Sequence, residues 1–218
     1  MLKETELWEK LTRILTHEIM NSLAPVTSIS HTLLSSSGDA ETMRQGLETI
    51  HSTSDRLLRF VDSFCAVTRI PTPQKAPFYL SELVAEACSL TARESVAVEV
   101  CITPEDTMLY ADRALMSQVF VNLLKNASEA LADFEGERKI TIHSTIDAEE
   151  RIQIEFTNNG SAIPAEVAEN IFTPFFTTKT DGSGIGLAVS RQIVRLHGGT
   201  LRLKHNDEGR VTFAIVME

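Results

Sequence analysis

Residues 70–77 read Ile-Pro-Thr-Pro-Gln-Lys-Ala-Pro, and this stretch divides the chain. Its prolines fix φ and remove backbone donors, so a helix cannot run through it. A proline-rich run of this kind is typical of a stiff linker. We therefore expect two domains, at residues 1–70 and 78–218, joined by a linker at residues 71–77.

Two helical patterns precede the linker. In residues 4–34 apolar side chains recur at the spacing of an amphipathic helix, with a bend expected at Pro25. After a turn-prone stretch at residues 35–39, the same spacing returns. The apolar positions are Leu7, Leu11, Leu15, Ile19, Leu23, Val26, Ile29 and Leu33, and then Met43, Leu47, Ile50, Leu57, Val61 and Phe64. We expect an antiparallel helical hairpin.

A hairpin with one long apolar stripe on each helix cannot enclose a core by itself. The apolar spacing is the kind used in four-helix bundles. A second copy would complete such a bundle, so the sequence predicts a homodimer. The alternative is that the hairpin packs onto the rest of the same chain.

The chain beyond the linker mixes helical and strand patterns. Helices are expected at residues 80–92, 112–131 and 185–196, and strands at residues 96–102, 140–144, 152–157, 200–204 and 211–216. The pattern predicts an α/β sandwich with helices on one face of a mixed sheet. With the hairpin in front of it, the fold class of the whole chain is α+β.

Composition narrows the classes of partner. The chain has 218 residues, 43 % of them hydrophobic, and 30 acidic against 20 basic residues give a formal net charge of −10. No Lys/Arg-rich run offsets that charge, so nucleic acid is not expected as a partner. The three cysteines are far apart and favour a reducing compartment.

The apolar runs are short, and none approaches the roughly 20 residues that a membrane-spanning helix needs. The first ten residues carry charges where a signal peptide would have an apolar core. We expect no membrane contact by this segment and a cytoplasmic location, which is compatible with an upstream sensor or membrane part.

Residues 181–187 read Asp-Gly-Ser-Gly-Ile-Gly-Leu and lead into an apolar helix. Glycines let backbone amides approach an anion, and the dipole of a following helix adds to the attraction. The stretch is consistent with a phosphate-binding loop, although a similar pattern occurs in ordinary tight turns. It lacks the lysine and hydroxyl of a P-loop.

Two asparagines stand on the helix expected at residues 112–131. Asn126 falls among the apolar positions of that helix, and Asn122 lies at the edge of them. One interpretation is a structural amide that bonds to the backbone. At this spacing the pair can instead offer two carbonyl oxygens to a hydrated magnesium ion or a phosphate-bound water.

One histidine of the hairpin stands out. His17 and Asn21 lie about 200° and about 240° around the helix from Leu15, at about 100° per residue, so both share a solvent-facing strip. Glu18 follows His17 directly. The remaining histidines are expected to be ordinary solvated surface residues; they are His31, His51, His143, His197 and His205.

Five stretches together resemble the sensor histidine kinases. Residues 15–23 with Pro25 look like the H box of a dimerisation and phosphotransfer hairpin. Residues 122–127, 158–164, 171–179 and 182–187 look like the N, G1, F and G2 boxes of the ATP-binding domain, in the family's order. The resemblance covers nearly the whole chain. It implies a dimeric four-helix bundle of the HisKA type followed by a Bergerat-type ATP-binding domain of the GHKL group.

The resemblance also implies a reaction. ATP and Mg²⁺ would bind in the second domain, with Asn126 as the magnesium ligand and a mobile lid at residues 172–186. His17 would attack the γ-phosphorus and Glu18 would accept the other ring proton. The phosphoryl group would pass to an aspartate of a response regulator, and Asn21 would orient the water that hydrolyses the phosphorylated regulator.

The residues expected at the nucleotide belong to these boxes and to the last strand. They are Asn122, Lys125, Asn126, Asn158, Gly160, Ile163, Phe175, Thr178, Lys179, Gly182, Ser183, Gly184, Ile185, Gly186, Leu187 and Thr212.

The chain departs from the family at the G1 box. Asn158 stands where the family has an aspartate that accepts an adenine amino hydrogen, and Ala162 stands where a second glycine is common. An asparagine oxygen can accept the same bond, but its amide nitrogen is a donor. Three alternatives remain open: an ATP-binding pseudokinase, a dimeric signalling scaffold, and a GHKL ATPase without histidine phosphotransfer.

Overall fold

The computed structural model describes residues 2–35, 40–92, 95–179 and 182–218. The chain forms two compact units, Met1–Arg69 and Ile70–Glu218. Residues 36–39 of the expected turn and the side chains of Leu7 and Leu11 lie outside the described part.

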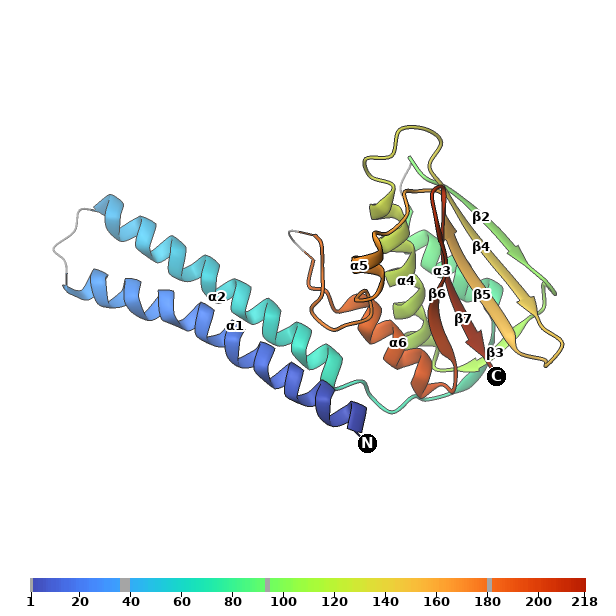
Figure 1. Ribbon diagram of the computed structural model, residues 1–218, viewed down its shortest axis with the longest axis horizontal. Coiled ribbons are helices and arrows are strands. Elements are labelled where there is room, and N and C mark those ends of the chain that lie inside the picture. Colours follow the sequence, from blue (N-terminus) through green and yellow to red (C-terminus); the bar gives the residue numbers. More distant parts are fainter. Residues whose placement is uncertain (1, 36–39, 93–94, 180–181) are drawn as a thin grey trace. The chain divides into compact units, whose positions relative to one another are not determined.

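The first unit is a pair of antiparallel helices, α1 (Leu2–Ser35) and α2 (Ala40–Thr68), as Figure 1 shows. Helix α1 continues through Pro25. The two helices approach closely at Gly46, where an added Cβ would lie 2.8 Å from Cδ1 of Leu33. The predicted helical hairpin is confirmed.

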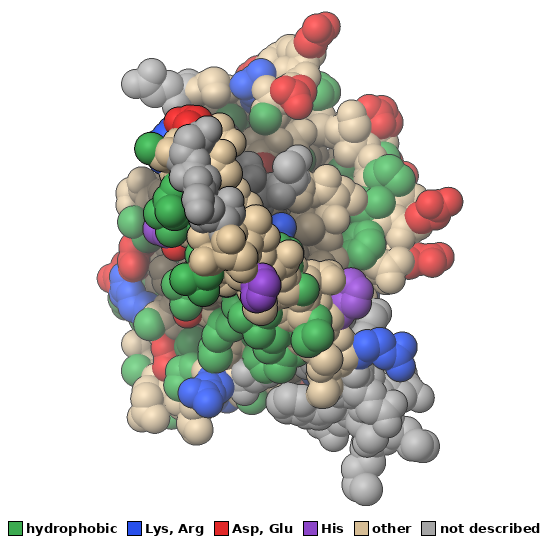
Figure 2. Space-filling view, turned by 90° about the vertical axis from the view of Figure 1, so that its left-hand side faces the viewer, with side chains coloured by type: hydrophobic (Ala, Val, Ile, Leu, Met, Phe, Trp, Pro, Cys, Tyr) green, Lys and Arg blue, Asp and Glu red, His purple; other side chains and the backbone are tan. Residues whose placement is uncertain are grey.

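The hairpin has little core of its own. Among its described side chains only Ser22 is buried, and the apolar residues that face the other helix are half-buried. Hydrophobic side chains are visible on the surface in Figure 2, which is viewed from the turn end of the hairpin. The large exposed apolar residues of the hairpin are Met20, Leu23, Leu34, Met43, Leu47, Leu58 and Val61.

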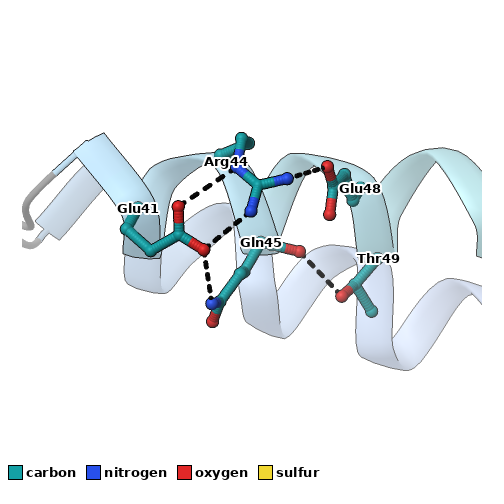
Figure 3. Close-up of polar contacts among 5 residues, drawn as sticks. All are labelled: Glu41, Arg44, Gln45, Glu48 and Thr49. Carbon is teal, nitrogen blue, oxygen red and sulfur yellow. Dashed lines mark hydrogen bonds and ion pairs between the residues drawn. The ribbon is translucent and has the colours of Figure 1, made fainter.

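Ionic contacts support the start of α2 (Figure 3). The guanidinium of Arg44 donates to the carboxylates of Glu41 and Glu48, and Gln45 Nε2 donates to Glu41 Oε1 over 2.8 Å. Because Arg44 is its main partner, the pKa of Glu41 lies below its ordinary value. These pairs have the three- and four-residue spacing that stabilises exposed helix faces.

The second unit is built on a five-stranded sheet in the order β2-β4-β5-β7-β6. Strands β2 (Ala97–Ile102) and β4 (Lys139–Ile146) are parallel, and the remaining pairs are antiparallel. The remaining strands of this sheet are β5 (Ile152–Asn158), β6 (Thr200–Asp207) and β7 (Arg210–Met217).

Three helices cover one face of this sheet (Figure 1). They are α3 (Leu80–Thr91), α4 (Arg113–Ala130) and α6 (Gly186–Leu196). Phe120 of α4 packs edge-to-face against Phe156 of β5 at a centroid distance of 5.0 Å, and both are almost fully buried. The predicted α/β sandwich is confirmed.

Three short elements were not predicted from the sequence. Strands β1 (Ala76–Tyr79) and β3 (Met108–Ala111) form a separate antiparallel pair, and α5 (Ala165–Ala168) is a single helical turn. Ala76 and Pro77 were expected in the linker, yet they pair with β3 in β1. A two-stranded sheet has only edge strands, where proline is tolerated.

His197 was expected at the surface, and this prediction is wrong. Its side chain is buried at the end of α6, where Nε2 accepts a hydrogen bond from the Asp112 amide over 3.0 Å. Nδ1 lies 2.8 Å from the carbonyl oxygen of Ile193 and donates to it. Since both ring nitrogens are used in hydrogen bonds, His197 is a structural residue that joins α6 to the start of α4.

Candidate functional site

A cavity of about 450 Å³ lies inside the second unit. Helix α4, the loop after β5, the segment between α5 and α6, and strand β7 all contribute to its walls. This volume is within the range of small-molecule sites. Two parts of the wall differ: one, called the polar end, is formed around α4 and the start of α6, and the other, called the apolar end, around β7 and the loop after β5.

The polar end is formed around α4 and the start of α6. Lys179 Nζ lies 3.4 Å from Oδ1 of Asn126 and forms an ion pair with Glu129, one helical turn further along α4. Asn122 Nδ2 donates to the hydroxyl of Ser190 over 3.0 Å, so its amide bonds to a side chain of α6. This end therefore gathers a cation, a carboxylate and two amides.

Two positions at this end require glycine, because other parts of the chain approach them closely. An added Cβ on Gly186 would lie 2.2 Å from Oδ1 of Asn122. Gly184 has a φ of +66°, and a Cβ there would lie 2.6 Å from the carbonyl carbon of Phe175. Because α6 begins at Gly186, the free amides of its first turn and its dipole favour an anion at this end of the cavity.

The apolar end is formed by β7 and by the loop after β5. Val211, Phe213, Ile163 and Ile171 line it. Asn158, the last residue of β5, is 3 % exposed there, and its Nδ2 has no hydrogen-bond partner in the described part of the chain. This end therefore offers a ligand an apolar surface and one buried side-chain amide.

The end of β6 and the turn that follows it hold the loop at this end. Asn206 Oδ1 accepts from the amide of Ile163 over 2.7 Å, and Asn206 Nδ2 donates to the carbonyl of Ile163 over 2.7 Å. The amide of Ala162 donates to Glu208, and that of Gly209 donates to the carbonyl of Gly160. Sequence reasoning missed Asn206 and Glu208, because neither belongs to a local motif.

Most residues that the sequence placed at a nucleotide do line this cavity. They are Asn122, Asn126, Asn158, Ile163, Thr178, Lys179, Gly182, Ser183, Gly184, Gly186 and Leu187. Lys125 and Ile185 line a neighbouring cavity of about 200 Å³ instead. Gly160 and Phe175 lie in the flanking segments and are not part of its wall.

The expectation for Thr212 needs correction. Its side chain is fully buried and its Oγ1 lies 2.9 Å from Oγ1 of Thr157 on the neighbouring strand. Successive side chains of a strand point to opposite faces, so Thr212 faces away from the side of Val211 and Phe213. With this register of β7 against β5, the side chain of Thr212 does not line the cavity.

Several lining residues were not expected. They are Ala127, Glu129, Ala130, Ser161, Val167, Ile171, Phe176, Thr177, Val211 and Phe213. For the apolar ones, the sequence does not distinguish a residue of a cavity wall from a residue of the core. Glu129 could have been found, because it lies three residues beyond Asn126 and therefore on the same side of α4.

The hairpin carries the second cluster of interest. His17 is 73 % exposed on α1, and its Nδ1 lies 3.0 Å from Nδ2 of Asn21 and 3.9 Å from Oε1 of Glu18. The three side chains form one polar group on the helix surface. An exposed imidazole with neighbouring hydrogen-bonding groups is suited to accept a group at the ring nitrogen that remains free.

Comparison with known proteins identifies the family of the chain. Residues 111–218 match the family of histidine kinase-, DNA gyrase B- and HSP90-like ATPases. The chain is 32 % identical to the sensor protein FixL of Bradyrhizobium diazoefficiens over 220 residues, which cover 93 % of this chain. It is 34 % identical to the solved catalytic domain of histidine kinase ThkA, covering 95 % of that domain and 66 % of this chain, with a TM-score of 0.59. The chain belongs to the sensor histidine kinases.

Further relatives extend the likeness to the hairpin. The sensory histidine kinase/phosphatase NtrB of Rhizobium meliloti is 30 % identical over 95 % of this chain. ThkA in complex with the response regulator TrrA matches 99 % of this chain at 28 % identity, with a TM-score of 0.66. This chain of the sensor histidine kinase family spans 42 % of the length of FixL and 57 % of that of NtrB. None of the helices in the described residues combines the length and apolar composition that a membrane span requires.

Proposed function

We propose that this histidine kinase core transfers the γ-phosphoryl group of ATP to His17 and then to an aspartate of a response regulator. The observation that carries the proposal is the polarity of the cavity. The free amides at the start of α6 lie beside Asn122, and the apolar side chains of β7 lie beside Asn158 at the end of β5. A nucleotide has the same division between its phosphates and its base.

Mg²⁺ would bind beside Asn126. An ammonium group already lies 3.4 Å from Oδ1 of Asn126 and next to the carboxylate of Glu129, so this corner of the cavity attracts cations. Mg²⁺ takes oxygen ligands and commonly binds one or two protein groups together with substrate phosphates. A bound Mg²⁺ would neutralise charge on the phosphates during transfer.

His17 is the proposed nucleophile. A neutral ring nitrogen would form the bond to the γ-phosphorus as the bond from phosphorus to the ADP oxygen breaks. Glu18, whose carboxylate lies 3.9 Å from Nδ1, would take the proton from the other ring nitrogen. Positioning and charge neutralisation supply most of the rate enhancement in such transfers.

The partner proposals have separate support. A response regulator as acceptor is supported by the complex of ThkA with TrrA, and phosphatase action through Asn21 by the name of NtrB. A homodimer is supported by the exposed apolar side chains of the hairpin, which a second copy would cover. We propose the cytoplasm as the compartment, because Mg²⁺-ATP is the substrate of the proposed reaction.

Labelling with γ-labelled ATP and Mg²⁺ tests the reaction. We expect an acid-labile label on the native chain and none on His17→Gln. His31→Gln is the matched control, because His31 is another exposed histidine of α1 and should leave labelling unchanged. ATP hydrolysis without label would indicate an ATPase, ATP binding alone would indicate a pseudokinase, and neither would indicate a scaffold.

A further inference from the structure

Asn158 is a polar side chain in apolar surroundings. It ends β5, is 3 % exposed, and is the direct cross-strand partner of Val211. With Phe213 and Ile163 it lines the apolar end of the cavity. A buried amide at such a place needs hydrogen-bond partners from the protein or from a ligand.

The protein supplies no partner for the nitrogen of this amide in the described residues. Nδ2 of Asn158 is buried and makes no hydrogen bond. Its neighbour is Gly160, where an added Cβ would lie 2.9 Å from Nδ2, so no side chain there can serve as acceptor. A ligand in the cavity that brings an acceptor would remove the cost of this unpaired donor.

The charge distribution of the cavity decides which part of a nucleotide reaches Asn158. Phosphates are drawn to the first turn of α6, which begins against Asn122. Asn158 instead lies beside Gly160, which is next to Ala130 at the end of α4, about 12 Å further along that helix at about 1.5 Å per residue. The flat base then lies against Val211 and Phe213. Its polar edge is the part that meets the carboxamide.

A carboxamide and a carboxylate can form different sets of hydrogen bonds with a base. It presents one acceptor and one donor, and a half-turn about the bond from Cβ to Cγ exchanges them. Adenine offers a donor at its amino group and an acceptor at N1, whereas hypoxanthine offers an acceptor at O6 and a donor at N1. Each base is matched by one of the two orientations.

We propose that Asn158 lets this pocket bind inosine triphosphate as well as ATP, an inference that rests on the proposed nucleotide site. A carboxylate at this position presents two acceptors, so with either base it would accept one hydrogen bond and face one acceptor, which is N1 of adenine or O6 of hypoxanthine. Asn158→Asp should therefore weaken the binding of both nucleotides, because the carboxamide alone matches both groups of either base.

Titration calorimetry of the full chain with Mg²⁺ and each nucleotide tests the proposal. We expect the two dissociation constants of the native chain to agree within about tenfold, the scale of one neutral hydrogen bond. In Asn158→Asp, which loses one hydrogen bond with each base, binding of each nucleotide should weaken by about tenfold. Asn159→Asp is the matched control, since it adds the same charge one residue away and its side chain bonds to the backbone of Lys139 and Glu137.

The outcomes are distinct. If the native chain binds ATP but excludes inosine triphosphate by more than about a hundredfold, the inference is overturned, and this measurement needs no variant. Unchanged binding of both nucleotides by a folded Asn158→Asp chain would also overturn it, because the carboxamide would then not contact the base. Failure of the native chain to bind either nucleotide would remove the proposed nucleotide site itself, and base selection with it.

Discussion

The side-chain nitrogen of Asn21 lies 3.0 Å from Nδ1 of His17, one turn earlier on α1. A donor in this place requires Nδ1 to be the unprotonated nitrogen. A half-turn of the Asn21 amide would instead present its oxygen, and Nδ1 would then carry the proton and leave Nε2 free. Asn21 and Glu18 thus lie at the same ring nitrogen, and Nε2 is the nitrogen left free when Nδ1 carries the proton.

Asn21→Ala should separate the two proposed reactions. We expect dephosphorylation of the partner regulator to fall by roughly a hundredfold, the scale of a lost water-orienting group. Labelling of His17 should persist, because Glu18 remains within reach of Nδ1. The measurement follows loss of label from the regulator and gain of label on the kinase. Unchanged dephosphorylation together with intact labelling would contradict the role of Asn21.

Asn206→Ala should weaken nucleotide binding, although the side chain of Asn206 lies outside the cavity wall. The change removes two hydrogen bonds to the backbone of Ile163 and leaves a part-buried amide and carbonyl unpaired, which costs about 1–3 kcal/mol. We expect a lower free energy of unfolding and a larger dissociation constant for ATP. Calorimetry and urea unfolding measure the two quantities.

Asn170→Ala is the control for Asn206→Ala. Its side chain makes one hydrogen bond to the carbonyl of Glu166 near α5 and does not line the cavity. It should leave ATP affinity close to that of the native chain. Equal ATP affinity in the Asn206 and Asn170 variants would refute the positioning role of Asn206.

Gly184→Ala should distort the segment that borders the phosphates. The φ of +66° costs about 1 kcal/mol for alanine, and the new Cβ would also lie 2.6 Å from the carbonyl carbon of Phe175. We expect a clear loss of ATP binding. Gly198→Ala is matched to it, because Gly198 also has a positive φ but an added Cβ there meets nothing within 4 Å. The two variants should therefore share the backbone cost and differ in ATP affinity, and equal affinities would rule out the steric effect.

Because of Asp112, the free energy of unfolding should depend on pH in the acid range. Its carboxylate accepts from the amides of Gln74 and Leu115, and these bonds hold its pKa below its ordinary value. Its contribution to stability is therefore present above the pKa of the unfolded chain, about 3.9, and is lost as the pH falls through the lower folded pKa.

Asp112→Asn tests this dependence. Asparagine also caps helices well, so the loss of unfolding free energy at pH 7 should stay below about 1 kcal/mol. The difference between native and variant should shrink as the pH is lowered below about 4, as measured by urea unfolding at several pH values. A difference that is the same at neutral and acid pH would show that the charge of Asp112 plays no part.

Local patterns were sufficient for most of the elements. The apolar spacing predicts both hairpin helices, and the β-branched runs predict all five strands of the main sheet. They do not predict β1 and β3, because each has four residues and forms only through pairing with the other. These short strands stand between polar, turn-like residues, so no hydrophobic periodicity marks them in the sequence.

The sequence by itself determined that the chain has a helical hairpin, an α/β domain and a set of glycines and asparagines suited to phosphate binding. These features follow from residues within one or two helical turns of each other. Only the tertiary structure decided that Thr212 faces away from the cavity, that His197 is buried, and that Asn206 holds Ile163 from 43 residues away. Sheet register and contacts between distant segments decide which hydrogen bonds a side chain can make, and such contacts leave no pattern in neighbouring residues.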